Sequence, residues 1–119
     1  MKKRILIIDD EPDVLDVLSQ YLENAGYETL SATNGEEGLT EFREKRPDLV
    51  LLDIAMAPMN GLEVLRRLKE IDKEAGVIMI TAFRDAEKVV TAFRAGAYDC
   101  LFKPFDYDYL IKTIRDKVQ

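Results

Sequence analysis

The stretch LVLLDIAMAPMNG, residues 49–61, joins an apolar run to an acid and then to a loop that contains Met, Pro and Gly. Four consecutive apolar residues, 49–52, are typical of a strand that is buried on both faces of a parallel sheet. The run ends at the carboxylate of Asp53. Because ligands of open parallel sheets bind at the carboxyl ends of the strands, Asp53 is a candidate functional acid.

The rest of the chain alternates strand-like segments with helical patterns. Segment 27–32 is less apolar and alternates apolar with polar side chains, as expected at the edge of a sheet. Strand–helix units with right-handed crossovers build a parallel sheet with helices on both faces, so the sequence predicts a doubly wound α/β fold. The predicted strands are 5–8, 27–32, 49–52, 77–80 and 100–102, and the helical patterns fall within 14–25, 34–47, 62–71, 89–97 and 110–118.

Several polar residues stand where helices are expected to begin. Asn34, with Glu37 three residues later, resembles a capping box. Asp85 and Asp106 precede the last two helical patterns and are predicted to cap them. Pro12 suits the first position of the first helix. These signals agree with the helical segments inferred from the apolar pattern.

The amino-acid composition limits the kinds of functional site that the chain can form. The chain has 119 residues, a net charge of −6, no His and one Cys. These numbers suit one domain and exclude His-dependent nucleophile systems, an internal disulfide and any cysteine-based zinc site. The negative charge argues against direct nucleic-acid binding, and no apolar run approaches the ~20 residues of a membrane helix. We therefore expect a cytoplasmic protein without direct membrane or nucleic-acid contact.

Polar residues follow four of the predicted strands and should meet at one edge of the sheet. Clustered carboxylates need a cation, and Mg²⁺ prefers carboxylates, water and phosphate oxygens. A lysine and a hydroxyl beside them equip the site to hold a phosphoryl group, for which a carboxylate can act as nucleophile. Each residue alone has an ordinary structural explanation, such as a first-turn acid or a loop hydroxyl, and only the combination indicates a site. The residues are Asp9, Asp10, Glu11, Asp53, Thr81 and Lys103.

Four motifs, in order, resemble the receiver domain of two-component response regulators: ILIIDDE, PDLVLLDIAM with MNG, MITAF, and AGAYDCLFKPFD. The resemblance covers essentially the whole chain. It implies a flavodoxin-like (βα)5 fold with a five-stranded parallel sheet in the order 2-1-3-4-5. The resemblance ends with the chain at Gln119, so we expect a single receiver domain over residues 1–119 without an output domain; the sequence is compatible with a stand-alone protein and with a piece of a longer regulator.

The resemblance implies a role for each acid of the site. Asp53 would accept a phosphoryl group from a phosphohistidine on a sensor histidine kinase or a histidine phosphotransfer protein. Asp10, Asp53 and the backbone carbonyl of Ala55 would hold Mg²⁺, with Asp9 acting largely through a bound water. The same resemblance implies Mg²⁺-dependent self-phosphorylation and autodephosphorylation in a protein that is primarily a signalling switch.

Further roles follow from the same resemblance. Lys103 would pair with the phosphoryl oxygens, and the Lys103–Pro104 peptide would be cis. Thr81 would move its hydroxyl onto the phosphoryl group. The surface of the fourth helix, fifth strand and fifth helix would then contact a downstream protein or output domain. A further hypothesis concerns water access, which the small Ala55 would leave open and Phe83 would cover.

Two residues depart from the family pattern. Ala57 follows the Met of the loop where the family usually has Pro, and the proline is displaced to Pro58. Because a residue before Pro is biased toward extended backbone, this change concerns the placement of the Ala55 carbonyl. Cys100 stands where the family usually has Tyr or Phe. We interpret Cys100 as a small packing residue rather than a redox sensor.

Rival functions fit less well. A haloacid-dehalogenase-type phosphatase would need an Asp-x-Asp loop after the first strand, where this chain has adjacent acids. A flavodoxin would offer a phosphate loop rich in hydroxyls and glycine, and acids at this position would repel its phosphate. The remaining alternative is a receiver-like adaptor that binds a partner without phosphorylation. Ala57 and Cys100 leave that alternative open.

Overall fold

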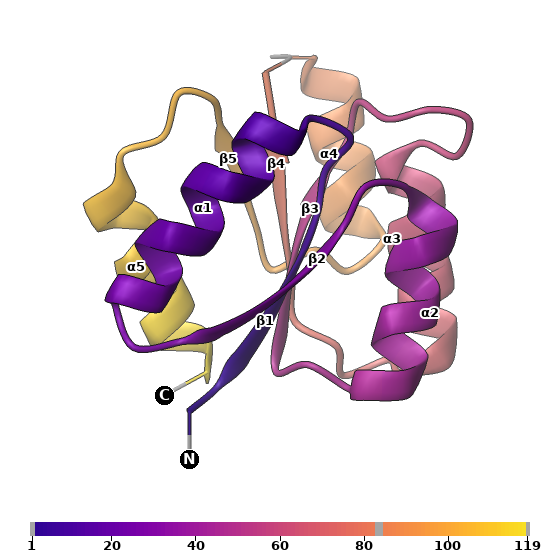
Figure 1. Cartoon of the computed structure of the whole chain (residues 1–119). Coiled ribbons are helices and arrows are strands. Elements are labelled where there is room, and N and C mark those ends of the chain that lie inside the picture. Colours follow the sequence, from indigo (N-terminus) through magenta and orange to yellow (C-terminus); the bar gives the residue numbers. More distant parts are fainter. Residues whose placement is uncertain (1, 83–84, 119) are drawn as a thin grey trace.

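The computed structural model describes residues 2–82 and 85–118 and has five strands that alternate with five helices along the chain (Figure 1). The predicted strands are confirmed to within one residue at each end. The helices follow the strands as the apolar pattern indicated. The elements are β1 (Arg4–Ile8), α1 (Pro12–Asn24), β2 (Glu28–Ala32), α2 (Gly35–Lys45), β3 (Leu49–Asp53), α3 (Gly61–Ile71), β4 (Val77–Thr81), α4 (Ala86–Arg94), β5 (Asp99–Phe102) and α5 (Tyr107–Val118).

The strands form one parallel sheet in the order β2-β1-β3-β4-β5. This order is the one that the resemblance implied, and β2 lies at an edge, as its mixed composition predicted. Strand order reverses between β1 and β3, since the chain crosses from β1 to β2 on one side and then continues from β3 on the other. The reversal leaves a natural binding position at the carboxyl ends of these two strands.

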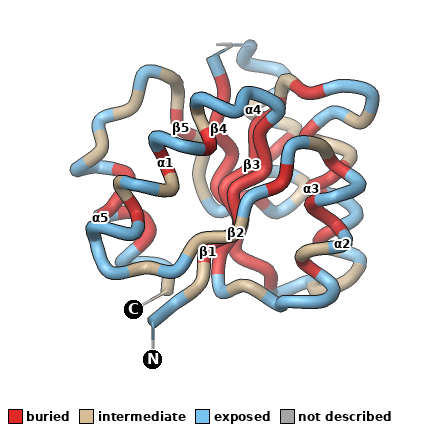
Figure 2. Tube along the Cα trace, in the orientation of Figure 1, coloured by how far each residue is buried: buried red, intermediate tan, exposed pale blue. Residues whose placement is uncertain are grey.

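Alternate residues of β1, β3, β4 and β5 pack into two separate cores. In β1, Ile5 and Ile7 face a core shared with α1 and α5, whereas Leu6 and Ile8 face a core shared with α2, α3 and α4. Figure 1 shows these two helical layers on opposite sides of the sheet. Figure 2 shows the central strands as buried and the outer helix faces as exposed. The central strands therefore have apolar cover on both faces, and the buried polar side chains of the sheet lie at the strand ends.

The predicted helix caps are confirmed. The Asn34 side chain accepts a hydrogen bond from the Glu37 N–H at 2.9 Å, and the Glu37 carboxylate accepts from the Thr33 N–H at 2.8 Å. The Asp85 carboxylate accepts from two N–H groups of the first turn of α4, and the Asp106 carboxylate does the same for α5. These contacts satisfy donors that have no partner within the helix.

The loop between β3 and α3 is held close to the end of β3. Gly61 N–H donates to the Ile54 carbonyl at 2.9 Å. A Cβ built on Gly61 would lie 2.1 Å from the Asp53 carbonyl oxygen, so only glycine fits there. The Ala57–Pro58 peptide is cis, which the sequence analysis did not predict, and the Lys103–Pro104 peptide is cis, as the resemblance implied.

Within the part of the chain that the structure describes, no helix has the length and apolar character needed to cross a bilayer.

Candidate functional site

The candidate site lies at the carboxyl edge of the sheet, where four adjacent strands end. Asp9 directly follows β1, Asp53 is the last residue of β3, Thr81 is the last residue of β4, and Lys103 directly follows β5. Asp9, Asp53 and Thr81 are buried, although each is polar. The parallel sheet thus brings together residues that are far apart in the sequence, as the sequence analysis predicted.

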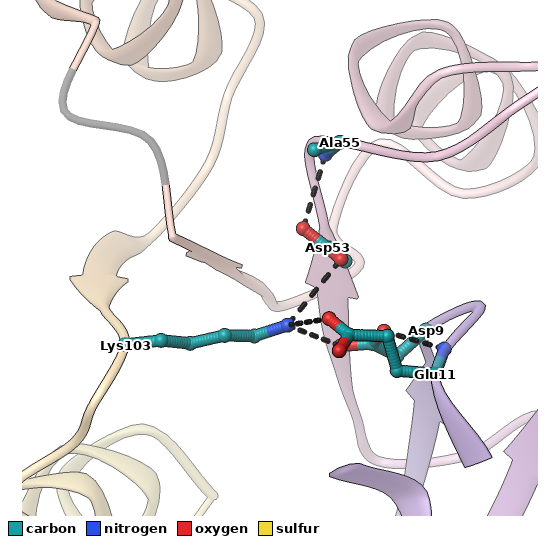
Figure 3. Close-up of polar contacts among 5 residues, drawn as sticks. All are labelled: Asp9, Glu11, Asp53, Ala55 and Lys103. Carbon is teal, nitrogen blue, oxygen red and sulfur yellow. Dashed lines mark hydrogen bonds and ion pairs between the residues drawn. The ribbon is translucent and has the colours of Figure 1, made fainter. Parts of the chain in front are cut away.

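Lys103 links the acids of the site. Its Nζ atom lies 2.8 Å from Asp9 Oδ2, 3.4 Å from Asp53 Oδ2 and 3.4 Å from Glu11 Oε1. Figure 3 shows the extended lysine side chain pointing at these three carboxylates. The side chain of Lys103 is only 14% exposed, so the ion pairs with Asp9 and Asp53 are shielded from water. Shielded pairs of this kind fix geometry more firmly than surface pairs do.

The two buried aspartates are also oriented by the backbone. Asp9 Oδ1 accepts from the Glu11 N–H at 3.0 Å, and Asp53 Oδ1 accepts from the Ala55 N–H at 3.0 Å. In both cases an Asp bonds the N–H two residues later, which is a common turn arrangement. Each aspartate therefore presents one oxygen to the backbone and the other to Lys103.

Burial shifts the protonation of the acceptor candidate. Desolvation raises the pKa of Asp53 from its ordinary value of 3.8 to about 6, against the lowering effects of the Ala55 N–H and Lys103. For Lys103, desolvation lowers the pKa, but the hydrogen bond to Asp9 and the nearby carboxylates outweigh it and the pKa is raised. The site therefore favours the charged form of Lys103, whereas burial disfavours the ionised form of Asp53.

Four acids form a group suited to a hard divalent cation. Oxygens of Asp9, Asp10, Glu11 and Asp53 all lie within 4.8 Å of one another, with Asp9 and Asp53 buried and the other two exposed. Carboxylate oxygens that open toward solvent are the donor set that Mg²⁺ prefers, because Mg²⁺ retains several of its waters. The residues present therefore fit this ion.

The remaining predicted residues lie at or near this edge. Thr81 extends β4 one residue past Ile80, the register partner of Asp53. The Ala55 N–H turns back to Asp53, which places Ala55 beside the candidate acceptor. Phe83 lies outside the described residues.

One contact was not predicted from the sequence. Glu11 was recognised as an acid at the edge, but its ion pair with Lys103 was not. The only sequence signal was its position directly after Asp9 and Asp10, which is equally typical of a first-turn acid.

Cys100 lies in β5 and is half-buried against the core shared with α2, α3 and α4. Desolvation and, to a lesser degree, the charge of Asp99 raise the pKa of its thiol. A raised pKa disfavours the reactive thiolate, which agrees with the interpretation of Cys100 as a packing residue.

Comparison with known proteins identifies the family. The sequence-family model named response regulator receiver domain matches residues 5–115 of this chain. The chain belongs to this family. A crystal structure of a CheY-like response regulator receiver domain protein from Methanospirillum hungatei has a TM-score of 0.95 and 34% identity over 99% of this chain and 94% of that one. The flavodoxin-like fold of receiver domains is therefore shown.

Two curated relatives differ in length. Sporulation initiation phosphotransferase F of Bacillus subtilis is 38% identical over 119 residues, which are 100% of this chain and 93% of the relative. The regulatory protein AtoC of Escherichia coli is 40% identical over 116 residues, which are 98% of this chain but 25% of the relative. The chain is thus a receiver domain of the two-component type, a class of phosphoacceptors that work with histidine kinases and output domains and generally bind Mg²⁺ at an acidic pocket.

Proposed function

We propose that Asp53 accepts a phosphoryl group from a phosphohistidine on a sensor histidine kinase or a histidine phosphotransfer protein, in a Mg²⁺-dependent reaction. The contact between Asp53 and Lys103, 3.4 Å long and set among three further acids, is the observation that carries this proposal. A carboxylate oxygen beside a fixed ammonium group is placed to attack phosphorus while the developing charge is neutralised. The chain has no His, so the donor histidine must come from the partner.

Asp9, Asp10, Asp53 and the backbone carbonyl of Ala55 would hold the ion, with Asp9 acting largely through a bound water. Mg²⁺ supplies neutralisation of the charge on the transferred group and orients it toward the acceptor. The acidic group of the site supports this assignment, because its oxygens are close together and partly open to solvent.

Two other residues would act on the transferred group directly. Lys103 would donate hydrogen bonds to phosphoryl oxygens, because its ammonium already lies beside Asp53. Thr81, at the end of the neighbouring strand, would bring its hydroxyl onto the same group. Phosphoryl transfer depends mainly on such positioning and charge stabilisation.

The output surface would be formed by α4, β5 and α5. Large exposed side chains support this assignment, since Val90 and Phe93 on α4 are each 46% exposed, Tyr98 before β5 is 44% exposed and Tyr109 on α5 is 50% exposed. We propose that this surface contacts a downstream protein or an output domain. The receiver itself, with a net charge of −6, would bind neither nucleic acid nor membrane directly, and would act in the cytoplasm as one domain over residues 1–119.

Intact-mass measurement after incubation with a small-molecule phosphodonor tests this function. The wild-type chain should gain one phosphoryl group when Mg²⁺ is present, and a chelator should abolish the gain. Asp53→Asn should remain unmodified, and Asp16→Asn, which removes an exposed acid of α1, should behave as the wild type.

The adaptor alternative makes the opposite prediction. A folded chain that binds Mg²⁺ but gains no phosphoryl group from the donor would favour binding without phosphorylation. Modification that persists in Asp53→Asn would instead place the acceptor elsewhere.

A further inference from the structure

Glu11 makes a contact with Lys103 that the roles proposed above do not use. Its Oε1 atom lies 3.4 Å from the lysine Nζ atom, although the Glu11 side chain is 62% exposed. The contact joins the residue that precedes α1 to the residue that follows β5, 92 positions later. Figure 3 shows the Glu11 carboxylate beside that of Asp9, facing the same ammonium group.

The three carboxylates match the full donor capacity of the lysine. An ammonium group has three N–H donors. Asp9, Glu11 and Asp53 each place one oxygen within 3.4 Å of it. In the phosphorylated protein one phosphoryl oxygen takes the place of the Asp53 carboxylate beside Lys103, and any further phosphoryl oxygen that accepts from the lysine has to displace Asp9 or Glu11.

The three carboxylates differ in burial and in how strongly the backbone fixes them. The side chains of Asp9 and Asp53 are 0% and 4% exposed, and a backbone N–H fixes the second oxygen of each at 3.0 Å. Withdrawing a buried carboxylate from its cation leaves an uncompensated charge, which is strongly unfavourable. The exposed carboxylate of Glu11 is instead rehydrated when it leaves, at little cost. Glu11 is therefore the acceptor that a phosphoryl oxygen displaces most easily.

Resting on the phosphoacceptor function above, we propose that Glu11 is a placeholder for a phosphoryl oxygen. It accepts a hydrogen bond from Lys103 in the unphosphorylated protein and is displaced by the incoming phosphoryl group. Because Glu11 competes for the lysine, it lowers the affinity of the site for phosphoryl groups. Glu11 is thus a positioning residue that acts through Lys103 and favours the unphosphorylated state.

Beryllofluoride, a small anionic mimic of a phosphoryl group, provides the equilibrium test. We expect Glu11→Gln to raise the affinity of the Mg²⁺-saturated protein for beryllofluoride about two- to fivefold, the effect of removing one partly exposed ion pair. Amide NMR signals followed during the titration give this affinity. Asp16→Asn removes one negative charge from an exposed position on α1 and should leave the affinity unchanged.

Two further measurements test whether the effect passes through the lysine. In a Lys103→Gln background, Glu11→Gln should no longer change the beryllofluoride affinity, because the competition has been removed. The affinity for Mg²⁺ alone, measured by the same NMR titration, should not rise in Glu11→Gln, because Glu11 belongs to the acidic group, so a gain in beryllofluoride affinity does not come from tighter Mg²⁺ binding.

Several results would overturn the inference while leaving the phosphoacceptor function intact. These are an unchanged beryllofluoride affinity in Glu11→Gln, an equal gain in Asp16→Asn, an equal gain without Lys103, or a rise in Mg²⁺ affinity that accounts for the gain. A folded wild-type protein that binds Mg²⁺ but not beryllofluoride would instead overturn the proposed function, and this inference with it.

Discussion

The buried acid Asp53 links proton binding to the stability of the fold. Its pKa is raised to about 6 by desolvation, whereas an exposed aspartate in the unfolded chain has its ordinary value of 3.8. Between these values the folded protein binds more protons than the unfolded chain does. The free energy of unfolding therefore falls as the pH rises through this window, and above it the ionised Asp53 remains a source of instability.

Replacing Asp53 with Asn should stabilise the metal-free protein at alkaline pH. We expect the free energy of unfolding to rise by about 1–3 kcal/mol at about pH 8, because the neutral amide avoids the desolvation of a charge. Urea unfolding in the presence of a chelator measures the change, and it should shrink toward about pH 4, where Asp53 is protonated. Asp16→Asn is the matched control, and a variant less stable than the wild type at alkaline pH would contradict the prediction.

Mg²⁺ should offset the instability that the ionised acids of the site cause. An ion that binds only the folded chain stabilises it by about 1.4 kcal/mol at ten times its dissociation constant. We therefore expect Mg²⁺ to raise the midpoint of thermal unfolding, and to raise it less in Asp53→Asn. Sodium chloride at equal ionic strength controls for screening. An equal rise with sodium chloride would show that the acids bind no specific ion.

Among the elements, the start of α3 packs against the backbone of Asp53. Gly61 opens this helix, and the Asn60 side chain caps it by accepting from the Glu63 N–H at 3.0 Å. A Cβ on Gly61 would meet backbone atoms of Asp53 and Ile54, which cannot move without shifting β3. The start of α3 and Asp53 are therefore in close backbone contact.

Gly61→Ala should impair both stability and phosphorylation. Overpacking of this kind costs about 1–3 kcal/mol, and the displaced backbone would move the Asp53 carboxylate away from Lys103. Gly26→Ala is the control, because its positive φ of 100° adds strain without any close contact for the new Cβ. Gly26→Ala should lose about 1–2 kcal/mol but retain the phosphorylation rate under folding conditions. Equal rates in Gly61→Ala and the wild type would contradict the coupling.

The elements were largely predictable because local and global signals agree. Buried runs such as 49–52 and caps such as Asn34 and Asp85 depend on few neighbours, and each fell where the sequence placed it. The convergence of Asp9, Asp53, Thr81 and Lys103 was predictable because a parallel sheet brings all strand ends to one edge. The contact between Glu11 and Lys103 was not, because it depends on the directions of two long side chains.

At the scale of the whole molecule, β5 belongs to both the site and the proposed output surface, and β4 is paired with it. Thr81 ends β4, and β5 runs beside it to Lys103, with Phe102 as the register partner of Thr81. The exposed rings of Phe93 and Tyr98 lie on α4 and before β5. A movement of Thr81 would therefore reach this surface through paired strands.

Beryllofluoride binding should perturb this surface more than the opposite part of the molecule. We expect amide chemical-shift changes at Val90, Phe93 and Tyr98 that exceed those along α2, because α2 packs beside β1 and β2. Thr81→Ala should weaken beryllofluoride binding, because the hydroxyl is lost, and at saturating beryllofluoride it should also reduce the distant changes. If the chemical-shift changes at the output surface are equal in Thr81→Ala and the wild type, Thr81 does not transmit the effect of beryllofluoride to that surface.

The ion pair between Asp9 and Lys103 spans 94 positions of a chain of 119 residues. During synthesis the acids of β1 and β3 leave the ribosome long before the lysine does. A nascent chain that has not yet reached β5 holds these acids without their cation, and its sheet still lacks one strand. If the proposed function holds, a chain that stops before β5 lacks Lys103 and one strand of the sheet, and it should therefore accept no phosphoryl group.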